Sequence, residues 1–149
     1  MLLPAMAEEP APSFIVAVAA AIFRDGKVLA MRRSLDKDAG PGLWETLSGR
    51  INEGEEPLAA AHREIFEETG LEVQVDPRPV TAYAANRLGR PMIVILYRGE
   101  HAGGEVRMSE EHDSHEWLTP EAFSTRTSLS TLADAVTQAA ATPPYRSDD

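Results

Sequence analysis

The 149-residue chain contains no cysteine and has few aromatic and basic residues. The absence of cysteine excludes disulfides, a thiolate nucleophile and cysteine-based zinc sites, and it fits a reducing, cytoplasmic setting. With 14 Lys and Arg against 24 Asp and Glu, the formal net charge is −10. This balance argues against a nucleic-acid partner, whose binding surface needs clustered positive charge. It still allows a small phosphorylated ligand, because a bound metal ion supplies positive charge locally.

The chain also lacks an apolar run long enough to cross a bilayer. Residues 13–23 are apolar, but they reach only about half the length of a membrane-spanning helix and end at Arg24-Asp25-Gly26. We interpret this run as a buried strand. The N-terminal stretch MLLPAMAEEPAP has no basic start and is interrupted by proline and glutamate, so it does not read as a signal peptide. We therefore expect no membrane partner.

The length predicts one α/β domain over residues 13–142, with tails at 1–12 and 143–149. Short apolar runs between turn residues predict strands at 14–23, 27–32, 43–48, 71–75, 80–85, 92–97 and 116–118. Connecting segments are expected at 34–42, at a turn over 99–104 that leads into 105–108, and at a polar loop over 109–115. Helical spacing predicts a closing helix at 130–141. Strands mixed with helices predict a mixed sheet.

The clearest helix lies between Gly54 and Gly70. Pro57 suits its first turn, and Gly70 suits the position just after its last residue. Apolar residues at helical spacing predict one buried stripe, made of Leu58, Ala61, Ile65 and Thr69 with Phe66 at its edge.

Three carboxylates on this helix predict a metal site. Glu64, Glu67 and Glu68 stand at i, i+3 and i+4, which places them on one helix face away from the centre of the stripe. Like charges at this spacing destabilise a helix by a few tenths of a kcal/mol. A divalent cation would reverse the sign of that effect, because hard cations such as Mg²⁺ prefer oxygen ligands.

Residues 49–71, GRINEGEEPLAAAHREIFEETGL, carry a longer pattern that includes these glutamates. The segment resembles the Nudix hydrolase signature at every fixed position, namely Gly49, Glu55, Arg63, Glu64, Ile65, Glu67, Glu68, Gly70 and Leu71. A solvated acidic helix face would explain clustered glutamates, but not glycine and arginine at these offsets. Many family members have Pro-Gly-Gly where this chain has Leu47-Ser48-Gly49, so the subgroup that acts on oxidised nucleotides is not indicated.

The resemblance implies a fold, a metal and a reaction. The fold is a Nudix-type α/β/α sandwich with a loop–helix–loop catalytic motif. Mg²⁺ or Mn²⁺ would bind the carboxylates of Glu64, Glu67 and Glu68 and the carbonyl of Gly49. Arg63 would hold the glutamates in position, and Glu55 would support the site from the loop. Water would attack a phosphorus of a nucleoside diphosphate derivative or of a (d)NTP-like substrate.

The general base has two sources in the sequence. Glu64 is one candidate, and a loop residue after the box is the other, with Glu111 first and Glu110 and His112 next. A solvated acidic loop is an equally good interpretation of this segment. A zinc site at His112 and His115 is disfavoured, because no matching ligands follow.

Substrate contacts are expected just before the box. Family members often place a phosphate-binding basic residue at the position of Arg32 or Arg33, although a surface charge at a strand end explains either equally well. Trp44 could stack on a base, but core packing is the favoured interpretation. Wall or lid positions after the box, for which an exposed loop is the favoured interpretation, are Tyr83, Asn86, Arg87 and Arg90.

The sequence therefore predicts a metal-dependent pyrophosphohydrolase with a small nucleotide-type substrate. The alternative is a nucleotide-binding regulatory module that keeps the fold with little or no turnover. Isomerisation of a prenyl diphosphate is disfavoured without a catalytic cysteine. A homodimer remains open.

Overall fold

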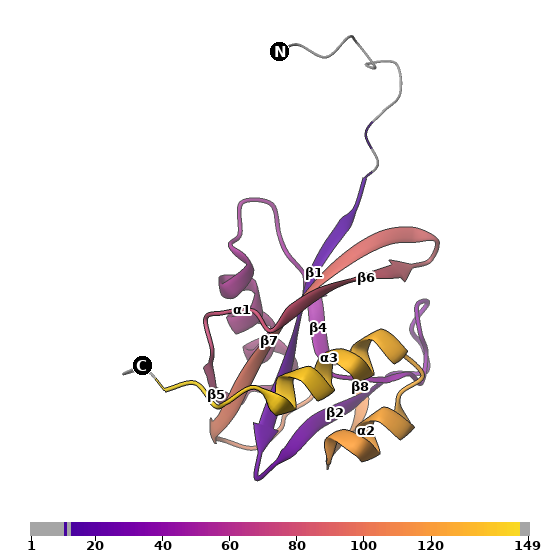
Figure 1. Cartoon of the computed structure of the whole chain (residues 1–149). Helices are drawn as coiled ribbons and strands as arrows, with labels where there is room; N and C mark the ends of the chain where they lie inside the picture. The colour runs from indigo at the N-terminus through magenta and orange to yellow at the C-terminus, as the bar shows by residue number, and fades with distance from the viewer. Residues whose placement is uncertain (1–10, 12, 147–149) are drawn as a thin grey trace, which may run out of the picture.

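The computed structural model describes residue 11 and residues 13–146, and most of the two expected tails (1–10, 12 and 147–149) lies outside the described residues. A sheet lies between helices on its two faces (Figure 1). The strands are β1 (Ile15–Arg24), β2 (Lys27–Arg33), β3 (Trp44–Glu45), β4 (Leu47–Arg50), β5 (Glu72–Val75), β6 (Thr81–Arg87), β7 (Arg90–Gly103) and β8 (His112–Leu118). The helices are α1 (Pro57–Thr69), α2 (Pro120–Arg126) and α3 (Ser130–Ala141). Within the described part of the chain, no helix is long and apolar enough to cross a membrane.

The sheet is mixed, as expected. Its main path runs β3-β2-β1-β7-β5, with β4 beside β1, β6 beside β7 and β8 beside β2. β1 and β7 are parallel, in a register that sets Val18 opposite Ile95, and the other strand pairs are antiparallel. β1 therefore lies at the centre of the sheet, where it organises the strands that carry the acidic motif.

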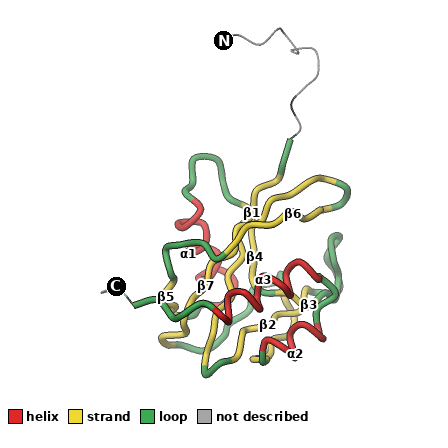
Figure 2. Tube along the Cα trace, in the orientation of Figure 1, coloured by secondary structure: helices red, strands yellow, loops and turns green. Residues whose placement is uncertain are grey.

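β1 is apolar throughout because both of its faces are covered. On one face Ala17, Ala19, Ala21 and Phe23 join the core under α2 and α3. On the other face Val18, Ala20 and Ile22 join the core under α1. A strand buried on both faces reads as a continuous apolar run rather than an alternating one. These two cores make the α/β/α sandwich (Figure 2).

The prediction of a turn at residues 99–104 is wrong, because β7 runs unbroken to Gly103. Gly99 lies inside the strand, where an added Cβ would come within 2.4 Å of Val73 Cγ1. This glycine permits close packing and does not mark a turn. The chain turns instead at Gly104, which has a φ of +83°.

Other element boundaries also differ from expectation. The single strand at 43–48 is divided into β3 and β4, and β8 begins inside the expected polar loop over 109–115. α2 was not expected; its cap is Thr119, whose Oγ1 accepts a hydrogen bond from the Ala122 N–H. α1 has the expected bounds, but Phe66 is 70% exposed and does not border the buried stripe.

We expect Arg98→Met to destabilise the fold. Arg98 is buried, and its Nη1 donates to the carbonyls of Ala139 and Thr142 at the C-terminus of α3. Removing the guanidinium takes this donor from the Thr142 carbonyl and leaves the Ala139 carbonyl with the Thr142 N–H alone, at a cost of about 2–4 kcal/mol in the free energy of unfolding. Chemical denaturation measures this change. The exposed Arg90→Met is the matched control; equal stability of the two variants would contradict the capping role.

Candidate active site

The loop between β4 and α1 is closed by its own hydrogen bonds. The Asn52 N–H donates to Glu55 Oε1 at 3.0 Å, and the Glu55 N–H donates to the Asn52 carbonyl at the same distance. Gly70 ends α1 in the left-handed conformation, with a φ of +67°, and its N–H donates to the Phe66 carbonyl. The expected loop–helix–loop is therefore present.

The Arg63 guanidinium joins the loop to the helix. Its Nε and Nη2 donate to the two oxygens of Glu55 at 2.7 and 2.9 Å, and Nη2 also donates to the Arg50 carbonyl. Its Nη1 donates to Glu64 Oε1 at 2.6 Å and to Glu67 Oε2 at 3.3 Å. Hydrogen bonds from Arg63 and from the Asn52 backbone hold the pKa of Glu55 down to about 2. Arg63 thus positions acidic side chains from both the loop and the helix.

Glu64 lies directly against Gly49. A Cβ at residue 49 would come within 2.0 Å of Glu64 Cδ, so the absence of a side chain there makes room for the carboxylate. Burial is the largest influence on Glu64 and raises its pKa, while the hydrogen bond from Arg63 acts in the opposite direction. Glu64 is therefore a buried carboxylate held between a strand backbone and an arginine.

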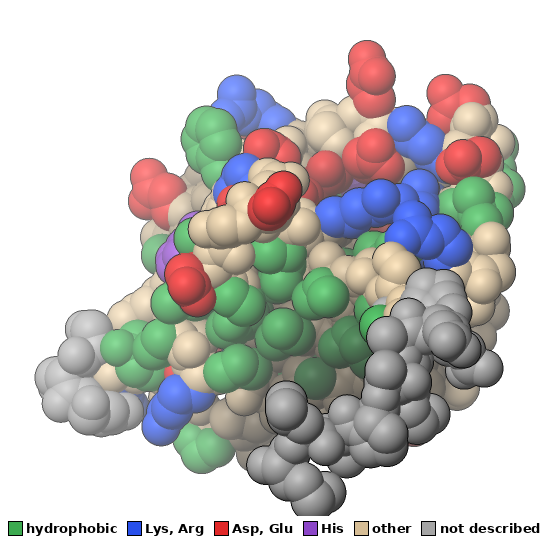
Figure 3. Space-filling view, turned by 90° about the horizontal axis from the view of Figure 1, so that it is seen from above, with side chains coloured by type: hydrophobic (Ala, Val, Ile, Leu, Met, Phe, Trp, Pro, Cys, Tyr) green, Lys and Arg blue, Asp and Glu red, His purple; other side chains and the backbone are tan. Residues whose placement is uncertain are grey.

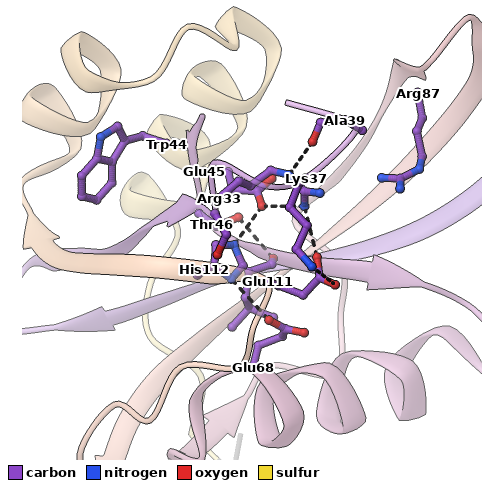
Figure 4. Close-up of polar contacts among 12 residues, drawn as sticks. Arg33, Lys37, Ala39, Trp44, Glu45, Thr46, Glu68, Arg87, Glu111 and His112 are labelled. Atoms are coloured by element: carbon purple, nitrogen blue, oxygen red, sulfur yellow. Dashed lines mark hydrogen bonds and ion pairs between the residues drawn. The ribbon is translucent and has the colours of Figure 1, made fainter. Parts of the chain in front are cut away.

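Glu68 lies one turn after Glu64 on the same face of α1 and is also buried. Its Oε2 accepts a hydrogen bond from Ser109 Oγ at 2.8 Å and lies 3.3 Å from His112 Nδ1. His112 Nε2 lies 2.9 Å from Glu45 Oε2, so one imidazole stands between two carboxylates (Figure 4). Burial lowers the pKa of His112, but the contacts with Glu45 and Glu68 outweigh burial and raise it to about 9. For Glu68 burial acts in the opposite sense and favours a higher pKa, but the hydrogen bonds with His112 and Ser109 bring the pKa of Glu68 below its usual value.

A cavity of about 820 Å³ lies over this helix face. Glu64, Glu67 and Glu68 line one side of it, and Glu67 is the most exposed of the three. The rest of the lining includes apolar residues from the sheet and from the start of α3, among them Ala17, Ala19, Ala85, Met92, Val94, Leu129 and Leu132. The volume is in the range of small-molecule sites in proteins.

Basic side chains face the same cavity. Arg33 Nη1 lies 3.7 Å from Glu111 Oε2, and Lys37 Nζ lies 3.6 Å from Glu111 Oε1. Arg33 and Arg87 both line the cavity, and Arg87 Nη2 lies 3.9 Å from Asp38 Oδ1. Seen from above, a band of Lys and Arg side chains lies among acidic ones (Figure 3). The site thus places positive charge close to its carboxylates.

Several residues expected at the site lie outside the cavity. Arg32 pairs with Asp113 at 2.7 Å. The Trp44 ring packs against the core, in agreement with the favoured interpretation, and the Arg126 guanidinium stacks over it. Tyr83, Asn86 and Arg87 line the cavity, but Arg90 does not. Glu110 and His115 are likewise absent from the lining, whereas Glu111 is part of it.

Sequence reasoning did not single out Glu45. It lines the cavity, is 8% exposed and contacts both His112 and Arg33. A usable signal was available: Glu45 is the one charged residue in the expected strand at 43–48, and a buried charge requires a partner. The burial of His112 could not be predicted from the sequence, because its neighbours along the chain are acidic and polar.

An acidic loop–helix–loop beneath a cavity, within an α/β/α sandwich, defines the class of Nudix-type hydrolases. The NUDIX domain family matches residues 13–139, and the chain belongs to this family. The chain is therefore a Nudix hydrolase, and its relatives include proteins named as pyrophosphohydrolases.

Individual relatives resemble the chain over most of its length. A MutT-like protein of Streptomyces ambofaciens is 36% identical over 116 residues, which cover 77% of this chain and 70% of that protein. A CTP pyrophosphohydrolase of Escherichia coli is 33% identical over 107 residues, covering 72% and 77%. The solved structure of a MutT protein from Methanosarcina mazei shares the fold, with a TM-score of 0.78, 23% identity and coverage of 88% and 96%. The chain spans only 32% of a longer relative named an octanoyltransferase, from Myxococcus xanthus.

We expect Gly49→Ala to displace Glu64 and reduce pyrophosphohydrolase activity by about 100-fold or more, because small misplacements in a site have effects of that size. Steady-state kinetics and a thermal melt separate loss of activity from loss of fold. Gly103→Ala is a matched control, since its Cβ would meet only the Glu72 carboxylate, at 2.9 Å, away from the cavity. Full activity of Gly49→Ala would show that the close approach to Glu64 is unimportant.

Proposed function

We propose that the protein is a divalent-metal-dependent pyrophosphohydrolase that cleaves a diphosphate linkage in a nucleoside diphosphate derivative or a (d)NTP-like substrate, with water as nucleophile. The observation that carries this proposal is one cavity bordered by three helix carboxylates and by the cations Arg33 and Arg87. A diphosphate is anionic along its length and needs compensating charge on more than one side. Cations of the chain and a metal ion on the glutamates together would provide it.

The donor set fits Mg²⁺ or Mn²⁺. Carboxylate oxygens from Glu64, Glu67 and Glu68 are hard ligands, and the side-chain-free backbone at Gly49 lies against the first of them. Among the described residues, no three His, Asp or Glu side chains are grouped to hold an ion as they stand. Arg63 accounts for this, because it holds oxygens of both Glu64 and Glu67. A bound ion would neutralise diphosphate oxygens and make a water molecule more acidic.

We favour Glu111 over Glu64 as general base. Glu64 is buried, hydrogen-bonded to Arg63 and proposed as a metal ligand. The side chain of Glu111 is 44% exposed at the cavity, where it is open to water. Arg33 and Lys37 lie near it, and both could turn to a phosphate chain instead. A base needs access to water and freedom to accept its proton, which supports Glu111.

The substrate's second half would lie on the apolar side of the cavity. Alanines at 17, 19 and 85 leave room above the sheet, and burial raises the pKa of the adjacent Tyr83 to about 12, so its hydroxyl stays neutral. A nucleobase suits such a surface, and a relative is named for CTP. Another relative, from Agrobacterium fabrum, is named an RNA pyrophosphohydrolase, so an RNA 5′ end belongs among the substrates to be tested.

We expect Glu68→Gln to reduce kcat by about 100-fold or more, because it removes a charged ligand from the metal site. The measurement is release of pyrophosphate or phosphate from NDP-sugars, dNTPs, dinucleoside polyphosphates, ADP-ribose and a 5′-triphosphorylated oligoribonucleotide, with Mg²⁺ and with Mn²⁺.

Two results would contradict the hydrolase proposal. Turnover by the wild type in excess EDTA would exclude the metal. Absence of turnover on the whole panel, with a nucleotide that still raises the melting temperature, would favour the alternative of a nucleotide-binding module.

We expect Arg87→Ala to raise KM about tenfold with little change in kcat. Arg87 lines the cavity, and its ion pair with Asp38 is long, at 3.9 Å, with an Asp38 side chain that is 77% exposed. A contact with a substrate phosphate would be worth roughly 1.5 kcal/mol or more. Arg90→Ala is the matched control on the same pair of strands, because Arg90 does not line the cavity. Equal KM values for both variants would exclude Arg87 from the substrate site.

Three further expectations stay predictions. They are the domain bounds of 13–142, a cytoplasmic location and a homodimer. Size-exclusion chromatography with light scattering tests the last of them directly.

A further inference from the structure

Three buried polar side chains from distant parts of the chain meet at one wall of the cavity, and two of them, Glu45 and Glu68, line it. Glu45 comes from β3, Glu68 from the last turns of α1 and His112 from the first residue of β8. They are 8%, 6% and 4% exposed. Charged groups are this deeply buried only when they are paired, so the partners of each group indicate its role.

Both nitrogens of His112 point at carboxylates. Nε2 lies 2.9 Å from Glu45 Oε2, and Nδ1 lies 3.3 Å from Glu68 Oε2. Nδ1 is buried and makes no well-formed hydrogen bond with the described residues, so the adjacent glutamate is the partner in reach. Each ring nitrogen therefore has one carboxylate oxygen as its neighbour, and the two carboxylates lie on opposite sides of the ring.

The contacts on Glu68 are made on one oxygen. Ser109 Oγ donates to Oε2 at 2.8 Å, and His112 approaches the same atom. Within the described residues, no hydrogen bond is made to Oε1. A carboxylate held by one oxygen keeps the other available for a ligand in the cavity that Glu68 lines.

We infer that His112 is a positioning residue, which holds Glu68 through Oε2 so that Oε1 faces the cavity, and that Glu45 orients the imidazole for this task. The inference rests on the proposed metal-dependent function, and it adds a residue outside the Nudix signature to the machinery of the site. Groups that orient a metal ligand from behind commonly change metal affinity by 10–100-fold when they are removed. His112 is therefore not the general base that its place in the loop made it a candidate for.

Two amide substitutions separate this role from simple space filling. The amide of His112→Asn can place its NH₂ where Nδ1 stands, toward Glu68, whereas that of His112→Gln can place its NH₂ where Nε2 stands, toward Glu45. We expect His112→Asn to retain Mn²⁺ affinity within a few fold of the wild type. We expect His112→Gln and His112→Ala to lose 10–100-fold.

The primary measurement is Mn²⁺ binding without substrate, by isothermal titration calorimetry, on the full chain. Thermal melts in EDTA check that each variant folds, and His115→Asn on the same strand is the control. Ser109→Ala provides a second variant that keeps the imidazole and removes the hydroxyl that donates to Glu68 and accepts from the Glu111 N–H, with an expected loss of several fold. In steady-state kinetics at subsaturating Mg²⁺, His112→Gln should lower kcat while the nucleotide KM stays near that of the wild type.

The outcomes distinguish this inference from the proposed function. Wild-type protein that binds no Mn²⁺ and hydrolyses no panel substrate would overturn both. Wild-type binding with equal affinities for His112→Asn and His112→Gln, or a tighter His112→Gln, would overturn the positioning role alone. If the His112 variants do not fold, unchanged Mn²⁺ affinity in Ser109→Ala would overturn the one-oxygen arrangement on Glu68.

Discussion

The Arg63 guanidinium is the interaction on which the site depends. Its planar fork binds Glu55 from the loop, Glu64 and Glu67 from the helix and the carbonyl at the end of β4. Like-charged glutamates on one helix turn repel each other, and a fixed cation among them offsets that repulsion. The same contacts raise the pKa of Arg63 itself, so the cation is permanent. One side chain therefore joins the loop, the helix α1 and the end of β4, and it stabilises their acidic cluster even when no metal is bound.

The sandwich gives this cluster a rigid base. Gly49 pairs with Val18 in β1, and β1 is buried on both faces. α1 packs its alanines and Ile65 onto the same strand, so Glu64 is pressed against Gly49 from a fixed direction. The basic residues that line the cavity come instead from the ends of the strands β2, β4 and β6, at Arg33, Arg50 and Arg87. The helix thus holds the carboxylates, and the strand ends place basic residues around the substrate space.

Local signals in the sequence predicted the parts that depend on neighbours in the chain. The bounds of α1 follow from Pro57 and Gly70, and the acidic motif follows from fixed spacing. Features that depend on distant contacts were missed. Gly99 predicts a turn when the sequence is read by itself, because its close packing against Val73 in the neighbouring strand is not visible there. The burial of His112 depends on Glu45, which lies 67 residues earlier. Of the two arginines considered as phosphate contacts, Arg33 lines the cavity, whereas its neighbour Arg32 pairs with Asp113.

The distribution of charge explains how an acidic protein can hold an anionic substrate. A net charge of −10 repels phosphates at long range, but salt screens that repulsion beyond about 10 Å. Inside the cavity the local charges decide: Arg33 and Arg87 line it together with the glutamates, and Lys37 lies against Glu111. Without substrate, Glu111 and Asp38 serve as the counter-ions of these cations. A diphosphate entering the cavity would compete with Glu111 for Arg33 and Lys37, and displacement would free a carboxylate beside the bond to be cleaved. Substrate binding and release of the proposed base are then the same exchange of ion pairs.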